Sequence, residues 1–417
     1  MNPNATPRGE RIHIAIFGRS NVGKSSVINV LTGQEIAVVS PVKGTTTDPV
    51  YKAMELLPLG PVVLIDTAGL DDEGMLGELR KQKTREIVSR TDLALLVADA
   101  ATGADDFFLE LLAELRAKGI PVIAVINKSD TVPNTGEIAA GMGEKLGVKC
   151  VAFSAMEGSG VNDLKQAIIA ALPHDEERFR IVGDLISPGD FVVLVVPIDK
   201  AAPKGRLILP QQQTIRDILE SDAIAIVTKE HELKATLDRL GRKPRLVITD
   251  SQVFLKVAAD TPKEVPLTSF SILFARHKGD LNELVKGARA IENLQDGDSV
   301  LIAEACTHHQ QSDDIGTVKI PRWLRQVTGK QLHIDHASGY SYPPDLNSYA
   351  LVVHCGACML NRRAMQHRIG ETLGAGVPIV NYGVLIAYVH GIFPRAIELF
   401  PSAVMAWEES APTPGCR

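Results

Sequence analysis

The stretch GRSNVGKS, residues 18–25, constrains the fold more than any other feature of this chain. It fits the pattern G-x-x-x-x-G-K-[ST], follows the apolar run IHIAIF and opens the helical segment SVINVLTG. Such a loop joins a buried strand to the N-terminus of a helix, because its backbone N–H groups and the helix dipole then face one anion. The motif therefore predicts an α/β domain built on a mainly parallel sheet.

The same pattern assigns chemical roles within the loop. Glycines let the backbone wrap a phosphate chain, Lys24 reaches the β and γ oxygens, and Ser25 ligates Mg²⁺. The residues expected to contact the nucleotide here are Gly18, Asn21, Val22, Gly23, Lys24, Ser25 and Ser26.

Two further segments complete the phosphate side. DTAG, residues 66–69, ends a second strand-like run, where Asp66 can hold the magnesium sphere and the Gly69 amide can sense the γ-phosphate. GTTTD, residues 44–48, supplies Thr46 as a switch residue over Mg²⁺. Leu70 stands where a water-orienting glutamine would be expected, and an apolar side chain cannot orient water.

The base side is predicted from NKSD, residues 127–130, and from Ser154 and Ala155, each at the end of another strand. The Asp130 carboxylate can accept two hydrogen bonds from the N1–H and amine of guanine, whereas adenine offers no such pair. We therefore expect GTP and GDP as ligands, with Asn127 and Lys128 supporting the base.

The order and spacing of these motifs resemble the translation-factor-like GTPases, of the TrmE and Era kind, over roughly residues 10–172. The resemblance implies GTP hydrolysis, with Lys24, Asn21, Thr46 and Gly69 as the catalytic residues. Some bacterial GTPases of this type use K⁺ beside the phosphates, and the resemblance carries that role to Asn21. The alternative is that Asn21 only stabilises the turn of the loop.

The chain is long enough for several domains, and three are expected: a P-loop domain at 1–175, then smaller α/β domains at 176–266 and 267–417. The polar stretch 173–184 is expected to be a linker. The uncharged run from residue 372 to residue 394 contains two prolines and four glycines. It is predicted to be a buried strand and helix rather than a membrane span.

Charge and the N-terminus limit the partners and the compartment. A formal charge of −6 and a pI near 6.0 provide no basic field, so nucleic acid is not expected as a partner. The first residues contain no apolar stretch of a signal peptide, so we expect a cytoplasmic protein with reduced thiols.

A second group of candidate ligands, separate from the nucleotide motifs, is HCGAC at residues 354–358, in a chain with five cysteines. Its upstream counterpart is CTH, with Cys306 and His308, and each half ends an apolar run, where ligands of open α/β sheets gather. Thiolates beside imidazoles suit zinc or an iron–sulfur cluster, and chemistry alone places zinc first. His309, His333 and His336 could approach this site. Cys150 is expected to be a buried residue of a strand, and Cys416 is expected on a mobile tail.

A GTPase head, a middle α/β domain and C-x-H followed by H-C-x-x-C together resemble the FeFe-hydrogenase maturation GTPase family over essentially the whole chain. The resemblance replaces zinc by a 4Fe-4S cluster on Cys306, Cys355 and Cys358. His308 and His354 match the histidines of the motif, and Glu408 is a candidate fourth ligand. Residues 195–219 resemble the family's dimerisation domain, which implies a homodimer.

The implied function is scaffolding. The chain would receive a two-iron subcluster precursor from two radical-SAM maturases and pass it to the apo FeFe-hydrogenase, with GTP hydrolysis acting as a switch. The alternative is a regulatory or ribosome-associated GTPase with a structural zinc module. A redox enzyme with its own iron–sulfur catalysis is disfavoured because no substrate-pocket motif is evident.

Overall fold

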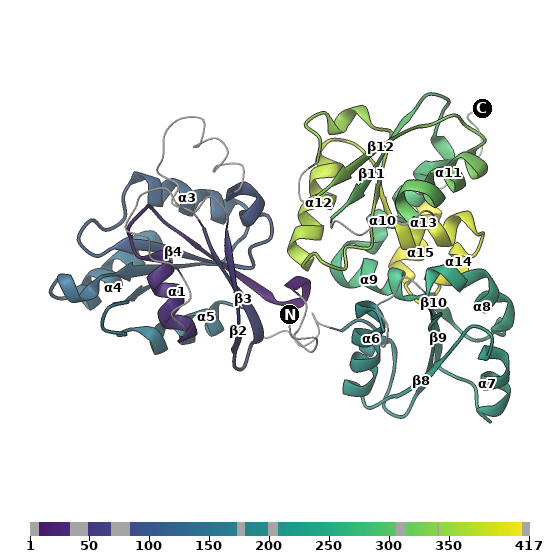
Figure 1. Ribbon diagram of the computed structural model, residues 1–417, viewed down its shortest axis with the longest axis horizontal. Helices are drawn as coiled ribbons and strands as arrows, with labels where there is room; N and C mark the ends of the chain where they lie inside the picture. The colour runs from purple at the N-terminus through teal and green to yellow at the C-terminus, as the bar shows by residue number, and fades with distance from the viewer. Residues whose placement is uncertain are drawn as a thin grey trace. The chain divides into compact units, whose positions relative to one another are not determined.

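The computed structural model describes residues 8–33, 49–67, 84–172, 180–198, 207–305, 314–339 and 342–410. The chain divides into two compact units, Met1–His174 and Asp175–Arg417 (Figure 1). Both units are α/β, and the predicted fold class, a P-loop domain followed by further α/β domains with mainly parallel sheets, is confirmed.

The first unit contains a six-stranded sheet in the order β2-β3-β1-β4-β5-β6. Its strands are β1 (Ile12–Phe17), β2 (Val50–Leu56), β3 (Gly60–Asp66), β4 (Leu93–Asp99), β5 (Val122–Asn127) and β6 (Lys149–Ala152). All neighbouring pairs are parallel except β2 and β3, which are antiparallel. The carboxyl ends of the parallel strands meet at one edge, where the motif loops begin.

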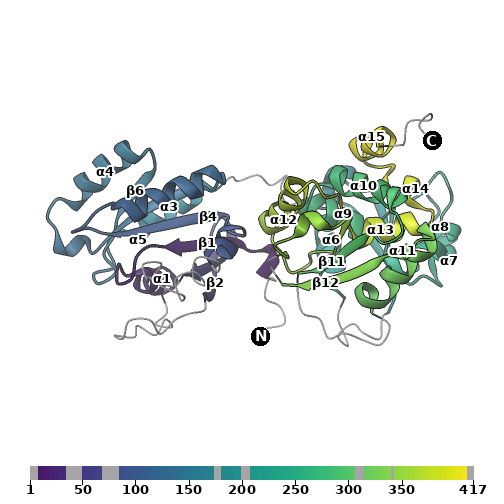
Figure 2. The same cartoon turned by 90° about the horizontal axis from the view of Figure 1, so that it is seen from above.

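Helices cover both faces of this sheet. They are α1 (Lys24–Thr32), α3 (Asp106–Ala117), α4 (Thr135–Leu146) and α5 (Val161–Ala171). One hydrophobic cluster packs α1 and α5 against one face, and a second packs α3 and α4 against the other. Figure 2 shows α1 and α3 on opposite sides of the sheet. The central strands are buried on both faces, which explains their continuous apolar sequences.

The second unit contains two four-stranded parallel sheets. The first has the order β10-β9-β7-β8, with β7 (Phe191–Val195), β8 (Ile224–Thr228), β9 (Leu246–Thr249) and β10 (Leu267–Ser269). The second has the order β12-β11-β13-β14, with β11 (Ser299–Glu304), β12 (His333–Ser338), β13 (Leu351–His354) and β14 (Ile379–Asn381).

One continuous hydrophobic core joins the two sheets of the second unit. Its helices are α6 (Leu209–Glu220), α7 (Leu233–Arg239), α8 (Phe254–Asp260), α9 (Phe270–Lys278), α10 (Leu281–Ala290), α11 (Ile320–Thr328), α12 (Arg362–Gly374), α13 (Tyr382–Val389), α14 (Phe393–Ile397) and α15 (Pro401–Glu409). The boundary expected after residue 266 falls immediately before β10, which pairs with β9. That boundary would therefore remove an edge strand from the first of these sheets.

The apolar run near the C-terminus folds as predicted. β14 and α13 occupy its centre, and both are largely buried. Among the described residues, no helix combines the length and the apolar character that crossing a membrane requires.

Candidate functional site

The phosphate-binding loop connects β1 to α1 and depends on two glycines. Gly18 has φ 151° and Gly23 has φ 92°, values that side-chain-bearing residues rarely adopt. A Cβ on Gly18 would lie 2.5 Å from the Val97 carbonyl oxygen, and one on Gly23 would lie 2.2 Å from the Asn127 amide nitrogen. Backbone conformation and close approach therefore both require glycine here.

Lys24 begins α1 and is 8% exposed. Its Nζ donates to the carbonyl oxygens of Gly18, at 2.9 Å, and Arg19, at 2.7 Å. The ammonium group therefore lies inside the turn of the loop, where backbone N–H groups and the helix N-terminus also favour an anion. Asn21 is exposed in the same turn and has φ 65°.

A hydroxyl and a carboxylate meet beside this loop. The Ser25 Oγ donates to Asp66 Oδ2 at 2.5 Å, across the gap between α1 and the end of β3. Burial raises the pKa of Asp66, while Ser25 and the charges of Lys24 and Lys52 act in the opposite direction. Oxygen ligands of these two kinds suit Mg²⁺, so the residues present fit that ion.

Asn127 connects three motifs in the nucleotide site. It is 2% exposed, and its Nδ2 donates to the Val22 carbonyl oxygen at 2.8 Å. The backbone N–H of Ala155 donates to its Oδ1 at 3.2 Å. One amide side chain thus holds the phosphate loop and the base loop at a fixed separation.

Asp130 lies in the short turn after β5 and is oriented by a neighbour. The fully buried Ser154 donates from Oγ to Asp130 Oδ1 at 2.5 Å, and it accepts the Glu157 N–H at 3.1 Å. Asp130 can still accept hydrogen bonds from a base, because a carboxylate has four lone-pair positions.

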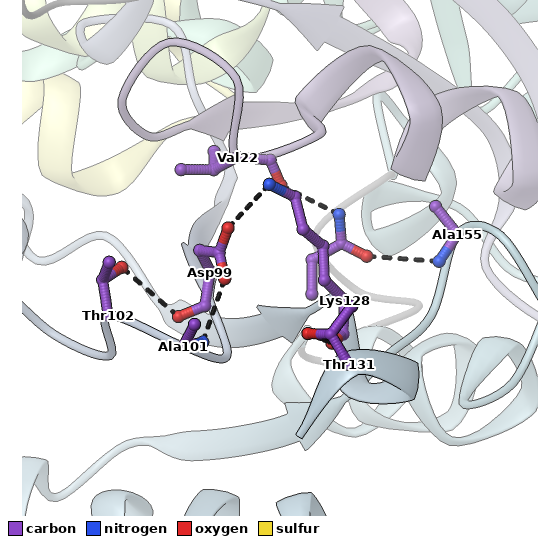
Figure 3. Close-up of polar contacts among 8 residues, drawn as sticks. Val22, Asp99, Ala101, Thr102, Lys128, Thr131 and Ala155 are labelled. Atoms are coloured by element: carbon purple, nitrogen blue, oxygen red, sulfur yellow. Dashed lines mark hydrogen bonds and ion pairs between the residues drawn. The ribbon is translucent and has the colours of Figure 1, made fainter.

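Sequence reasoning missed Asp99 at the end of β4. Lys128 Nζ lies 2.6 Å from Asp99 Oδ2, and Figure 3 shows this contact beside the Val22 and Ala155 interactions. Partial burial raises the pKa of Asp99, but the Lys128 hydrogen bond, the Ala101 N–H and the Lys128 charge leave it lowered. The available signal was an acidic residue, Asp99, directly after the apolar run of residues 93–98. In the structure it lies in register with Asn127.

Several predicted residues lie outside the described part of the chain. They are Thr46, Gly69 and Leu70 in the first unit and Cys306, His308, His309 and Cys416 in the second. Cys150 lies in β6, as expected, but it is half-buried rather than buried. His333 and His336 are exposed on β12, and Glu408 is exposed on α15.

Cys355 directly follows β13 and is 6% exposed. Its N–H donates to the Ala303 carbonyl oxygen at 2.9 Å, and its Sγ accepts the Ala305 N–H at 3.3 Å. Burial raises the pKa of the Cys355 thiol, while the N–H groups of Ala305 and Ala357 act against that rise. The end of β11, immediately before Cys306 in sequence, therefore meets the Cys355 sulfur.

His354 is fully buried and neutral. Its Nδ1 lies 2.7 Å from the Cys355 carbonyl oxygen, which can only accept, so Nδ1 carries the proton. Its Nε2 then carries a lone pair, and this buried atom has no hydrogen-bond partner among the described residues. Burial, followed by the Arg368 charge, lowers the pKa of His354 to about 3.

A buried lysine fixes the remainder of the HCGAC loop. Lys278, at the end of α9, is 2% exposed, and its Nζ donates to the carbonyl oxygens of Cys358 at 3.2 Å and Leu360 at 2.9 Å. Ala357 within the loop has φ 53°. Cys358 is half-buried. The spacing of the two thiols is thus held by contacts from another helix.

The donor chemistry of this second site fits a thiolate-bound metal centre. Two cysteines and a neutral imidazole nitrogen are soft or intermediate ligands for zinc or iron–sulfur centres. Within the described ranges, no three His, Cys, Asp or Glu side chains converge on one point, and Cys306 and His308 are not among those residues.

Comparison with known families assigns each part of the chain. The hydrogen maturase F dimerization domain matches residues 181–279, and the hydrogen maturase F tetramerization domain matches residues 282–399. The 50S ribosome-binding GTPase family matches residues 13–128. The chain belongs to the hydrogen maturase F family.

Curated relatives outside the family are GTPases. The tRNA modification GTPase MnmE of Desulfotalea psychrophila is 37% identical over 174 residues, which cover 40% of this chain and 37% of that protein. GTPase Der of Rhizobium leguminosarum is 32% identical over 254 residues, which cover 58% of this chain and 50% of that protein. The chain thus spans half or less of the length of these two relatives.

A solved structure of a variant of Aquifex aeolicus Era bound to GDP.AlF4- is 21% identical and has a TM-score of 0.37. The match covers 52% of this chain and 91% of that one.

Proposed function

We propose that this hydrogen maturase F family member is a GTP-hydrolysing scaffold. It holds a 4Fe-4S cluster and a two-iron subcluster precursor, and it delivers the precursor to the apo FeFe-hydrogenase. The observation that carries the proposal is the Ala305 N–H to Cys355 Sγ hydrogen bond, in a chain that matches both hydrogen maturase F domain families. That bond brings the strand end preceding Cys306 to the HCGAC loop.

The nucleotide site would act through this chain's own residues. Lys24 and the backbone of residues 18–26 hold the phosphates, Ser25 and Thr46 bind Mg²⁺, and Asp130 reads guanine. Mg²⁺ and K⁺, when bound, neutralise charge on the phosphate oxygens. Because Leu70 cannot orient water, we assign the K⁺ position to Asn21, which is exposed in the phosphate-binding loop and has φ 65°.

The thiol site would hold the cluster through Cys306, Cys355 and Cys358. Three cysteine ligands leave one iron able to take a labile ligand. His354 is a candidate for that position because its Nε2 lone pair is buried and unpaired while Nδ1–H is held by a carbonyl, the usual arrangement of a ligating histidine. His308 is a second candidate from the motif.

The remaining proposals concern organisation. We propose that residues 181–279 form the homodimer interface and that the third part of the chain begins near residue 280, because β10 and α9 belong with the preceding region. GTP hydrolysis would release the segments around Thr46 and Gly69, changing the affinity for the two radical-SAM maturases or the hydrogenase. Allosteric coupling of about 1–3 kcal/mol suffices for such a change. The protein would work in the cytoplasm, where thiols stay reduced.

Anaerobic purification followed by reconstitution with iron and sulfide tests the scaffold. We expect a brown protein with about four irons and four sulfides per chain. Lys24→Ala should lose GTP turnover and keep its iron, whereas Cys355→Ser should lose iron and keep nucleotide binding. A colourless protein with one tightly bound zinc would favour the regulatory GTPase with a structural zinc module.

A further inference from the structure

Arg368 is a buried cation held from two sides. It lies on α12 and is 3% exposed. Its Nη1 donates to the Gly339 carbonyl oxygen at 3.1 Å, and its guanidinium carbon lies 4.1 Å from the centroid of the Tyr342 ring. One hydrogen bond and a cation–π contact therefore fix the plane of the guanidinium group.

Among the described residues, the opposite edge of the guanidinium has no hydrogen-bond partner. Arg368 Nε and Nη2 are both buried and make no hydrogen bond, and no carboxylate of the described residues pairs with them. Burial raises the pKa of the neighbouring Tyr342 hydroxyl, while the charge of Arg368 and the side chains of Thr372 and Arg368 act against that rise. The Nε and Nη2 donors point side by side, which is the arrangement that binds an anionic acceptor bidentately. Leaving such a charge unpaired in the interior is strongly unfavourable, so this edge predicts a ligand.

Backbone contacts place the Arg368 guanidinium group near the thiol site. Gly339, which accepts from Arg368, donates its own N–H to the Glu304 carbonyl oxygen at 2.8 Å. The next residue, Ala305, donates to Cys355 Sγ at 3.3 Å. Three consecutive contacts thus lead from the guanidinium to the sulfur, all at the carboxyl edge of the β12-β11-β13-β14 sheet.

Other charges do not satisfy Arg368. Glu304, the nearest carboxylate in this chain of contacts, accepts from the Tyr382 hydroxyl at 3.0 Å. Glu371 on α12 is exposed and lies 3.8 Å from the His367 ring. Burial raises the pKa of Cys355 and lowers the pKa of His354, and the positive charge of Arg368 acts to lower both. The described residues therefore supply no anionic partner to this edge, and an anionic ligand beside Cys355 would supply one.

We propose that the Nε and Nη2 edge of Arg368 is an anion receptor, and that its occupant is the anionic face of a metal–sulfur centre held by Cys355 and Cys358. This inference depends on the proposed scaffold function. Three thiolates outweigh the charge of an oxidised 4Fe-4S core, so the centre is an anion with sulfur acceptors. Hydrogen bonds to those sulfurs and a neighbouring positive charge stabilise the reduced cluster and raise its reduction potential.

The test compares reconstituted full-length proteins. Arg368→Gln removes both the charge and the paired Nε and Nη2 donors, whereas Arg368→Lys keeps the charge without the paired donors. Arg322→Gln removes an exposed arginine from α11 and is the matched control. Iron release to a chelator and the midpoint potential, measured by EPR during a dye-mediated titration, are the readouts. Loss of an outer-shell partner lowers metal affinity about 10- to 100-fold.

We expect Arg368→Gln to release iron at least about tenfold more readily than wild type, with a more negative midpoint potential. Arg368→Lys should lie between the two, and Arg322→Gln should match wild type. Equal iron release and equal midpoint potentials in wild type and Arg368→Gln would refute the proposal that Arg368 is an anion receptor. If Arg368→Gln does not fold, the same comparison with Arg368→Lys decides.

A second measurement separates the cluster from a free oxyanion. Inorganic phosphate is added to metal-free wild type and Arg368→Gln, and the thermal midpoints are compared. An Arg368-dependent rise with phosphate would identify a soluble oxyanion as the occupant and overturn our assignment; no rise supports it. If wild type takes up no iron and sulfide at all, the scaffold function itself fails, a result distinct from failure of the receptor.

Discussion

Replacing Lys278 by methionine should destabilise the second unit through the loop that carries both thiols. The lysine is 2% exposed, and its Nζ donates to the carbonyl oxygens of Ala357, Cys358 and Leu360 at 3.4, 3.2 and 2.9 Å. Methionine is similar in length and has no donor, so these buried acceptors lose this partner. The loop between Cys355 and Cys358 is the part most directly affected.

The size of the effect follows from opposing terms. A hydrogen bond from a charged group contributes about 1.5–3 kcal/mol, and an unsatisfied buried acceptor costs about 1–3 kcal/mol. Three such contacts together exceed the desolvation cost that removing the ammonium recovers, so the net loss in the free energy of unfolding is about 3–5 kcal/mol. With a urea m-value of about 2.5 kcal/mol/M, the transition midpoint falls by about 1–2 M.

Tryptophan fluorescence reports this unit selectively. The chain has two tryptophans, Trp323 on α11 and Trp407 on α15, and both belong to the second unit. Urea unfolding of the metal-free protein, excited where only tryptophan absorbs, therefore separates the second unit from the first. Lys286→Met is the matched control, because Lys286 pairs with Glu283 on the exposed face of α10. Its loss should cost about 0.3–0.5 kcal/mol.

A Lys278→Met midpoint within about 0.3 M of wild type would mean a net contribution below about 1 kcal/mol and would refute this reasoning. A drop as large in Lys286→Met would show that charge alone, rather than the carbonyl contacts, sets the stability.

Three further predictions concern the nucleotide site. Gly23→Ala should weaken binding of a fluorescent GDP analogue about tenfold or more, because φ 92° and the 2.2 Å approach to Asn127 both oppose a Cβ. Gly33→Ala, at φ 63° with open space around it, is the control. Equal GDP affinities of Gly23→Ala and wild type would contradict the steric argument. Asp99→Asn should weaken GDP binding only about two- to fivefold, because its ion pair with Lys128 is partly exposed, and competition with ADP should show guanine selectivity intact. GTP hydrolysis should be faster in K⁺ than in equimolar Na⁺, and Asn21→Ala should abolish that difference; identical wild-type rates in both salts would remove the K⁺ assignment.

The local pattern of apolar residues was sufficient to predict most strands of the first unit. The apolar runs at β1, β3, β4 and β5 are largely buried on both faces, so their sequences are continuously apolar and readily recognised. The strands that sequence reasoning missed are at edges or short: β2 alternates in burial, β10 has three residues, and β12 is largely exposed. Edge strands bury one face or less, so their sequences carry a weak apolar signal.

The sequence by itself determined the phosphate loop, the guanine motif and the identity of the thiols, because each depends on residues a few positions apart. Only the tertiary structure decided which distant groups serve them. Lys278 lies about 80 positions from the carbonyls that it contacts, Asp99 lies 29 positions from Lys128, and Arg368 lies 29 positions from Gly339. A charged side chain has no inherent partner along the chain. Its burial and its pairing arise only when sheets and helices pack and exclude water.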